Sequence, residues 1–378
     1  MRQRRATTRG VSLVELTPQT EARQAPAEVR SIQYLRGFAA FGVLVFHAAE
    51  RAGGAFGLGA AGVDVFFVIS GFIMWVVTCR RPPSPAQFMI KRVQRIVPLY
   101  WGLTLLVAGV ALAAPWVFPA MQVSAAAVLK SLFFVPYQDH TGLIAPLVIP
   151  GWTLNYEMFF YVLFAAGLLA PTKIRPWLVT AALVALVAVR PLGDTANPLW
   201  ATYTNPLLLE FGAGVWLGKA WSDGRLPGVR TGWALVILGL LGFAGAGFSE
   251  IDVERARPLI WGVPAFLLVA GAVAIERQGE VPNWRPLQAL GDASYSLYLV
   301  HGLAISATIR ILEAVGLASP ALILAAGLIA GVVAGLVTYQ LVEKPLMRLF
   351  KTGLGGRAKA GPSRPAATVP PPAPSGSR

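Results

Sequence analysis

An apolar segment that carries two ionisable side chains constrains this chain more than any other feature. The segment Ser31–Glu50 reads SIQYLRGFAAFGVLVFHAAE, with Arg36 near its start and His47 deep inside it. The two positions are eleven residues apart, so on a helix they differ by roughly 20° and lie on one face, about 16 Å apart along the axis. Ionisable groups in hydrocarbon cost roughly 3 kcal/mol or more each, which makes both residues candidates for function. Two structural alternatives stay open: Arg36 is an interfacial anchor, or His47 is a hydrogen-bonded packing residue.

The composition is that of a membrane protein. Hydrophobic residues make up 55% of the chain and charged residues 13%, whereas soluble domains carry roughly twice that share of charge. The formal net charge is +14, but the basic residues lie in short turns between apolar runs, which is a membrane pattern and not a nucleic-acid-binding surface. We therefore expect the lipid bilayer as a partner and no nucleic acid.

The cysteine and histidine content argues against disulfides and metal sites. The chain has one cysteine, Cys79, and three widely separated histidines, His47, His140 and His301. A single cysteine cannot form an intrachain disulfide, and the histidines lack the spacing of zinc ligands. We therefore expect no metal.

Ten apolar runs predict an all-α polytopic membrane protein, a bundle of about ten transmembrane helices. The fifth run is the shortest and needs flanking residues to approach the roughly 20 residues that cross a bilayer. The expected spans are Ser31–Glu50, Gly62–Thr78, Ile96–Ala114, Gly151–Ala170, Trp177–Val189, Trp200–Ala220, Gly232–Phe248, Pro258–Ile275, Leu290–Leu312 and Ala321–Val342.

The distribution of basic residues predicts that both termini are cytoplasmic. An even number of spans leaves both termini on one side, and an inside N-terminus assigns about 26 Lys and Arg to cytoplasmic segments and about six to outer ones. We expect one transmembrane domain over residues 31–350. Residues 1–30, polar and Arg-rich, and residues 351–378, rich in Pro, Ala and Gly, are expected to be disordered cytoplasmic tails.

One short motif lies in the second span and another lies just before the third span. Ser70 and Gly71, in GVDVFFVISGFIMW, form a small pair that lets a helix or a ligand approach the backbone closely. Arg92 and Arg95, in KRVQR, share a face if this stretch is helical, and two guanidinium groups suit phosphates. The structural alternatives are a helix-packing notch and a positive-inside anchor that touches anionic lipid.

The fourth span begins with a cluster of polar and aromatic residues. In GWTLNYEMFFY they are Trp152, Asn155, Tyr156 and Glu157. A carboxylate within a membrane span needs a partner or water, and the expected partners of Glu157 are His47 and Arg36. His47 with Glu157 would make an acid/base pair, and a buried structural ion pair is the alternative. Further candidates in the last two spans are Tyr295, His301 and Glu343.

Together these motifs resemble the acyltransferase 3 family, integral membrane O-acyltransferases that modify surface glycans. The resemblance covers about Ile32–Leu349, and FFVISGFIMW is most similar to the exopolysaccharide branch of the family. In chain order the motifs are Arg36-x10-His47, FFVISG at Phe66–Gly71, Arg92-x-x-Arg95, WTLNYEMFFY around Glu157, SYSLYLVH ending at His301, and Glu343-Lys-Pro345.

The resemblance implies an acyl-CoA donor, above all acetyl-CoA, on the cytoplasmic side, with no permanently bound cofactor. It implies a polysaccharide or lipid-linked glycan as acceptor at the outer face of a bacterial inner membrane, with polysaccharide biosynthesis or export proteins as further partners. By similarity, Arg92 and Arg95 face the donor phosphates and Arg36 holds the donor within the membrane. Ser70 and Gly71 would let the pantetheine arm pass the second span.

The expected mechanism uses His47 as general base on the acceptor hydroxyl or as acyl carrier, with Glu157 assisting. Expected substrate contacts also include Trp152, Asn155, Tyr156, Tyr295 and His301. A proton-coupled transporter or flippase for a glycan or lipid-linked precursor is the alternative function, because such carriers also use intramembrane Arg, His and Glu. A non-catalytic partner in a polysaccharide export complex is a third.

Overall fold

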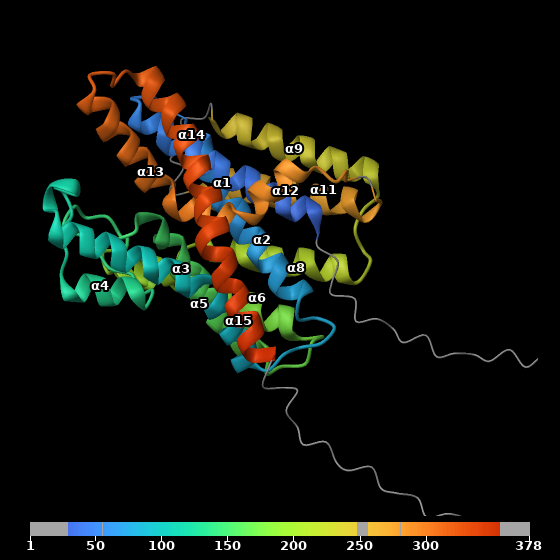
Figure 1. The fold of residues 1–378 in the computed structure, drawn as a ribbon. Coiled ribbons are helices and arrows are strands. Elements are labelled where there is room, and N and C mark those ends of the chain that lie inside the picture. Colours follow the sequence, from blue (N-terminus) through green and yellow to red (C-terminus); the bar gives the residue numbers. More distant parts are fainter. Residues whose placement is uncertain (1–28, 55, 248–255, 280, 356–378) are drawn as a thin grey trace, which may run out of the picture.

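The computed structural model describes residues 29–54, 56–247, 256–279 and 281–355 (Figure 1). These residues form helices and turns, with one isolated β-bridge between Gln138 and Ile144. Most of the two predicted tails, residues 1–28 and 356–378, lies outside the described residues. The α-helices are α1 (Arg30–Arg51), α2 (Gly62–Val76), α3 (Pro85–Ala113), α4 (Ala125–Leu132), α5 (Trp152–Gly167), α6 (Arg175–Ala188), α7 (Pro198–Tyr203), α8 (Leu208–Ser222), α9 (Val229–Gly247), α11 (Val263–Arg277), α12 (Arg285–Asp292), α13 (Ser294–Ala314), α14 (Pro320–Thr338) and α15 (Lys344–Gly355).

The predicted all-α membrane fold is present. Within the described ranges, eight helical segments are long and apolar enough to cross a membrane. They fall on eight of the ten predicted spans. The other two predicted spans, the fourth and the sixth, fall on α5 and α8, which are 16 and 15 residues long.

Helix α2 runs through the centre of the bundle, and most of its side chains are buried. It packs against α8 at backbone distance, because a Cβ on Gly71 would lie 2.0 Å from the carbonyl oxygen of Phe211, and one on Gly214 would lie 2.0 Å from that of Val68. Only glycine permits this approach, which is the small-residue packing typical of membrane helices. Ser70, next to Gly71, is thereby turned toward the other side of α2, where the site lies.

Helix α3 begins earlier than the sequence predicted, so the basic stretch before the third span is part of the helix itself. Ser84 accepts a hydrogen bond from the backbone N–H of Gln87, and the Gln87 side chain accepts one from the Ser84 backbone, which is a capping box. Pro85 at the first helical position suits this start. Arg92 and Arg95 therefore lie on one rigid helix, three residues apart, as the motif predicted.

Two predicted spans are broken in the structure. The sixth is divided into α7 and α8 because Pro206 lacks a backbone donor and disfavours helix at Asn205, whose side chain instead accepts a hydrogen bond from the Leu207 backbone. The ninth is divided into α12 and α13 at Ala293. There Gly291 packs directly on α1, where a Cβ would lie 2.1 Å from the carbonyl oxygen of Gln33.

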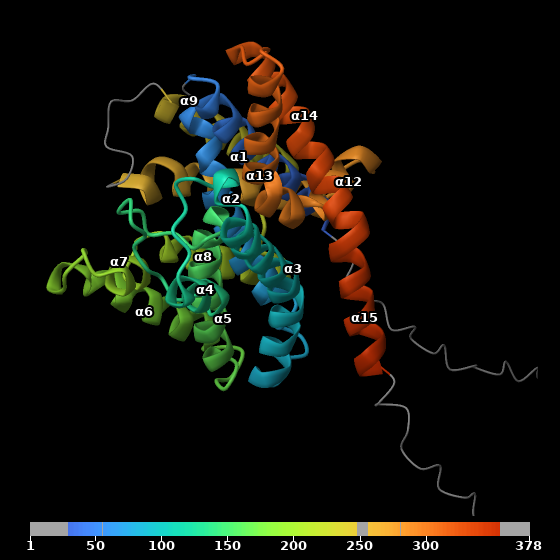
Figure 2. The ribbon, with the colours of Figure 1, turned by 60° about the vertical axis from the view of Figure 1, so that its left-hand side comes forward.

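The last predicted span is longer than expected. Helix α14 continues through a π-helical turn, Tyr339–Glu343, into α15, and the view in Figure 2 shows them as one long helix at the edge of the bundle. A π turn is a common feature of functional sites because it shifts the side chains that follow it. Here it ends at Glu343, whose side chain is buried against α13 and α3.

Candidate active site

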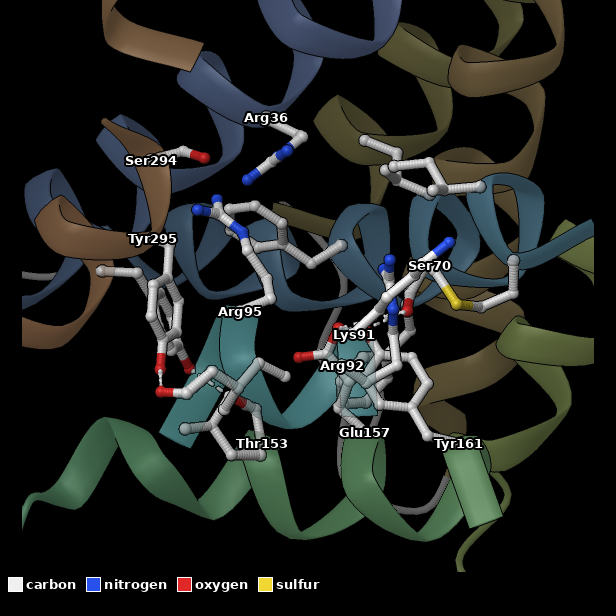
Figure 3. A pocket seen from close by; sticks show the side chains of 18 of the residues that line it. Arg36, Ser70, Lys91, Arg92, Arg95, Thr153, Glu157, Tyr161, Ser294 and Tyr295 are labelled. Atoms are coloured by element: carbon white, nitrogen blue, oxygen red, sulfur yellow. Dashed lines mark hydrogen bonds between the residues drawn. The ribbon is translucent and has the colours of Figure 1, made fainter. Parts of the chain in front are cut away.

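A cavity of about 580 Å³ lies among α1, α2, α3, α5, α13 and α15 (Figure 3). Of the residues that line it, four are cationic, namely Arg36, Lys91, Arg92 and Arg95, and one is a carboxylate, Glu157. Apolar side chains of α2, such as Phe66 and Met74, complete the wall. A narrow, largely apolar cavity with an excess of guanidinium groups suits a ligand that joins anionic groups to an uncharged arm.

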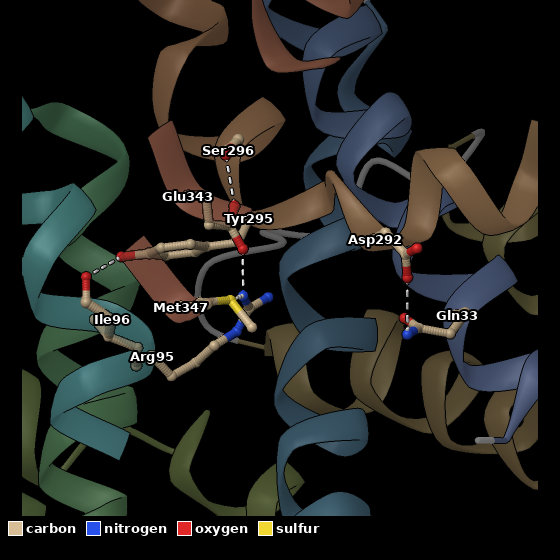
Figure 4. A network of polar contacts seen from close by, with 8 residues as sticks. All are labelled: Gln33, Arg95, Ile96, Asp292, Tyr295, Ser296, Glu343 and Met347. Carbon is tan, nitrogen blue, oxygen red and sulfur yellow. Dashed lines mark hydrogen bonds and ion pairs between the residues drawn. The ribbon is translucent and has the colours of Figure 1, made fainter. Parts of the chain in front are cut away.

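Arg95 is held at the cavity wall by groups from the last helices (Figure 4). Its Nη1 donates a hydrogen bond to Glu343, and its Cζ lies 5.5 Å from the ring centroid of Tyr295. Ser296 Oγ donates to the second oxygen of Glu343 at 2.5 Å, and the Tyr295 hydroxyl donates to the Ile96 carbonyl at 2.7 Å. Glu343 thus orients Arg95 and balances its charge from outside the cavity.

Several polar groups along the cavity form no hydrogen bond with another described residue. In Figure 3, Arg36 points toward Arg95, whose positive charge acts on it. Arg36 forms no hydrogen bond or ion pair with another described residue. The buried Ser294 hydroxyl and the Nε of Arg92, both at the cavity, also lack partners in the described part of the chain. Buried donors without acceptors are costly, so an anionic ligand here would satisfy them.

Glu157 faces the cavity from α5. Its Oε1 accepts hydrogen bonds from Ser70 Oγ, at 3.1 Å, and from the Tyr161 hydroxyl one turn further along α5. The sequence analysis expected His47 and Arg36 as its partners, and this is corrected: neither forms a hydrogen bond or ion pair with Glu157. The hydrogen-bond partners of Glu157 are neutral hydroxyls: Tyr161 lies on α5 itself, and Ser70 meets Glu157 because α5 packs against α2. Arg36 interacts with Glu157 through its charge only.

His47 lies beyond the cavity, where it stacks on His301. The two ring centroids are 5.1 Å apart and the ring planes differ by 26°. His47 Nδ1 is 3.3 Å from a carboxylate oxygen of Glu50, and the buried His301 has its Nδ1 2.6 Å from the Tyr298 carbonyl oxygen. Each Nδ1 therefore donates its hydrogen to an oxygen, which leaves both Nε2 atoms as free bases in the neutral rings.

Tyr298 separates this histidine pair from the cavity. Its side chain lines the cavity, its hydroxyl accepts a hydrogen bond from Thr153 Oγ1 at 3.1 Å, and its ring centroid is 5.9 Å from that of His301. Neither His47 nor His301 lines the cavity. Arg36 and His47 thus share the unbroken helix α1, as predicted, but only Arg36 faces this cavity.

Several predicted substrate contacts are packing residues in the structure. The contact face of Gly71 meets α8, so the packing alternative, and not passage of a pantetheine arm, explains this glycine. Trp152 and Tyr156 stack edge to face at 5.8 Å, Tyr156 packs on Phe67 at 5.9 Å, and Asn155 is buried. None of the four lines the cavity, because Gly71 faces α8 and α5 turns the side with Thr153 and Glu157 toward the cavity.

The sequence analysis missed several residues of the site. Glu50 lies three positions after His47, the spacing at which helical side chains meet, and that spacing was the available signal. Tyr161 follows Glu157 at the same kind of interval. Thr153 and Tyr298 lie inside the two motifs WTLNYEMFFY and SYSLYLVH, but nothing in the sequence indicates that their hydroxyls meet.

Comparison with known proteins defines the class. The family model described as an acyltransferase domain, acyltransferase 3, matches residues 29–340. The chain therefore belongs to the acyltransferase 3 family and is a membrane acyltransferase that transfers groups other than amino-acyl groups.

Three relatives illustrate the range of the family. The exopolysaccharide production protein ExoZ of Rhizobium meliloti (strain 1021) is 42% identical over 83% of this chain and 99% of its own length. The acyltransferase MdmB of Streptomyces mycarofaciens is 30% identical over 91% of this chain and 95% of its own. The peptidoglycan O-acetyltransferase OatA of Listeria monocytogenes is 25% identical over 75% of this chain and 50% of its own. No solved structure matches the chain.

Proposed function

We propose that this protein is a membrane O-acyltransferase that moves an acyl group, above all acetyl, from cytoplasmic acyl-CoA to a hydroxyl of a surface or exported glycan. The names of relatives support a glycan acceptor, since they include an exopolysaccharide production protein and a peptidoglycan O-acetyltransferase. The host membrane would be a bacterial inner membrane. The single observation that supports the donor is the cationic cavity with its unpartnered polar groups.

The proposed topology has ten spans and cytoplasmic termini. Helices α5 and α8 complete the eight long spans, although each is shorter than the roughly 20 residues that cross an average bilayer. Both pack in the interior of the bundle, where a short helix needs no lipid contact along its whole length. In this topology the Lys91 and Arg92 end of the cavity faces the cytoplasm.

In the proposed binding mode, acyl-CoA enters the cavity with its phosphates toward the cations of α3. Its phosphates would lie at Lys91, Arg92 and Arg95, whose charges are otherwise balanced only in part. Its uncharged pantetheine arm would follow the apolar side of α2 at Phe66 and Met74. The thioester would then reach the end of the cavity formed by Tyr298.

The proposed chemistry takes place at Nε2 of His47. This nitrogen accepts the proton of the acceptor hydroxyl while the hydroxyl oxygen attacks the thioester carbonyl carbon. The new C–O bond forms, the C–S bond breaks, and the leaving thiolate takes the proton back from the imidazolium. Transfer through an acyl-imidazole would use the same nitrogen. Glu50 orients His47 by accepting its Nδ1 hydrogen, while Glu157 assists from the donor cavity. Tyr298 has to move aside for the thioester to reach the imidazole.

The test is an assay on purified protein in lipid nanodiscs with labelled acetyl-CoA and glycan from a strain that lacks this chain. We expect an alkali-labile acetyl ester on the glycan, and mass spectrometry of the parent strain's polysaccharide should show the same mass difference. A transporter would move glycan across proteoliposomes and form no ester. The proposal would be refuted if the protein forms no ester and the polysaccharide of the deletion strain is as acetylated as that of its parent.

A further inference from the structure

A second and larger cavity lies on the side of the histidine pair away from the donor cavity. It is a groove of about 1170 Å³ between the α3–α5 connection and the last turns of α13. Pockets for one drug-sized ligand measure roughly 300–1,000 Å³, so the groove is large enough for a ligand at or above the upper end of that range. The proposed function gives no role to this groove.

The charges in the groove are mixed. Its lining includes three basic residues, Arg51, Lys130 and Arg310, and two carboxylates, Asp139 and Glu313. The same lining holds neutral hydrogen-bonding groups on Gln138, Thr141 and Ser306. A ligand made of phosphates would select cations alone, whereas sugar hydroxyls both donate and accept hydrogen bonds and need both kinds of partner.

The loop at the base of the groove is built around one carboxylate. Asp139 Oδ1 accepts hydrogen bonds from Thr141 N at 2.8 Å, Thr141 Oγ1 at 2.6 Å and Leu143 N at 3.0 Å. Its slight burial alone would raise the pKa of Asp139, but the bonds from Thr141 and Leu143 outweigh this and lower it, so the group is ionised at neutral pH. All three bonds use Oδ1, so Oδ2 remains available to a ligand hydroxyl.

The groove reaches the end of α1 that carries His47. Arg51, which lines the groove, lies four residues after His47 on α1, which is about one turn, or roughly 6 Å along the axis. Residues four apart on a helix share a face, so Arg51 and His47 lie on the same side of α1. A saccharide bound in the groove beside Arg51 would therefore lie about one helical turn from His47.

We propose that this groove is the binding site for a saccharide acceptor, with Lys130, Asp139 and Arg310 as its principal polar contacts. The assignment rests on the proposed function, because only an acyl transfer at His47 requires an acceptor there. It also names the side from which the acceptor enters: the face formed by the α3–α5 connection, opposite the mouth of the donor cavity.

The test uses protein in nanodiscs and oligosaccharides cut from the de-esterified extracellular polysaccharide of a strain that lacks this chain. Lys130→Gln/Arg310→Gln and Asp139→Asn are compared with Lys173→Gln/Arg225→Gln, a matched loss of two exposed cations that line neither cavity. Oligosaccharide binding, coenzyme A binding and ester formation are measured separately. Parallel arms with free and lipid-linked oligosaccharide identify which form of the saccharide is bound.

We expect the groove variants to weaken oligosaccharide binding and raise the acceptor KM by about tenfold, the effect of losing roughly one charged hydrogen bond. The dissociation constant for coenzyme A should stay within about twofold of the wild-type value, as it should in the matched control. If both groove variants bind the acceptor with unchanged affinity and still form ester, the groove is not the acceptor site, while the proposed acyltransferase function stands. Oligosaccharide binding that depends on the groove, with no ester formed by wild type, would support the groove and refute the acyltransferase mechanism.

Discussion

The two cavities differ in the chemistry of their walls more than in their position. The donor cavity has four cations, one carboxylate and buried donors without partners, and its cations lie on α1 and α3. The groove is about twice as large and mixes cations, carboxylates and neutral amides and hydroxyls on a loop and on helix ends. Under the proposed function, this contrast would let one bundle hold a polyanionic donor and a polyhydroxylated acceptor apart, with the imidazole of His47 between them.

The largest effect is expected from removing that imidazole. His47→Ala should lower kcat by about 10³-fold, because general base catalysis contributes roughly 10²- to 10⁴-fold. Coenzyme A binding should not change, since His47 does not line the donor cavity. Single-turnover transfer of labelled acetyl in nanodiscs measures the rate, and a fall of less than tenfold in well-accumulated protein would remove His47 from the chemistry.

The second-largest effect is expected from removing a guanidinium group from the donor cavity. Arg36→Gln and Arg92→Gln should each raise the acyl-CoA KM by about 10- to 100-fold, since a hydrogen bond to a charged group is worth roughly 1.5–3 kcal/mol. The acceptor KM should stay constant, and Lys173→Gln serves as control because it lines neither cavity. Equal weakening of donor and acceptor would mean that the two cavities are not separate sites.

A smaller effect is expected from Glu50, which acts through His47. Glu50→Gln should lower kcat by about tenfold, because the amide still contacts Nδ1 but stabilises the imidazolium less. A positioning role also predicts that the pH at which the rate is half-maximal moves down, since loss of the carboxylate favours the neutral ring. An unchanged pH profile would show that Glu50 and His47 are not coupled.

The smallest effect is expected from ionic strength, which should change the KM of the two substrates to different extents without any mutation. Raising the ionic strength from about 0.05 M to about 0.5 M shortens the Debye length from roughly 14 Å to roughly 4 Å. The acyl-CoA KM should then rise by about fivefold, while the KM of an uncharged acceptor should change by less than twofold. Parallel titrations of both substrates measure this, and equal sensitivity would contradict the division of charge.

Much of the fold was predictable because it depends on continuous apolar runs. The unbroken run of α1 places Arg36 and His47 on one helix, and the spacing of Arg92 and Arg95 places both on one side of α3. The break at Pro206 was not predicted, although a proline within an apolar run was an available signal for it.

The partners of the buried polar groups were not predictable. Arg95 and Glu343 are 248 residues apart and meet only because α15 packs beside α3, and Ser70 meets Glu157 because α2 packs beside α5. The sequence suggested His47 and Arg36 as partners of Glu157 because a carboxylate within a membrane span needs a partner. Local helical spacing was the better guide, since it pairs His47 with Glu50.

The hydrogen bond between Thr153 and Tyr298 has a consequence for the whole cell. In the proposed topology the donor cavity and the groove open to opposite sides of the membrane, and the Tyr298 ring with the stacked imidazoles would lie between them. If the ring stayed aside between turnovers, water could form a continuous file and carry protons down the transmembrane potential, which drives each unit charge with about 2.3 kcal/mol per 100 mV. A membrane acyltransferase with two such openings would therefore also have to serve as an electrical insulator.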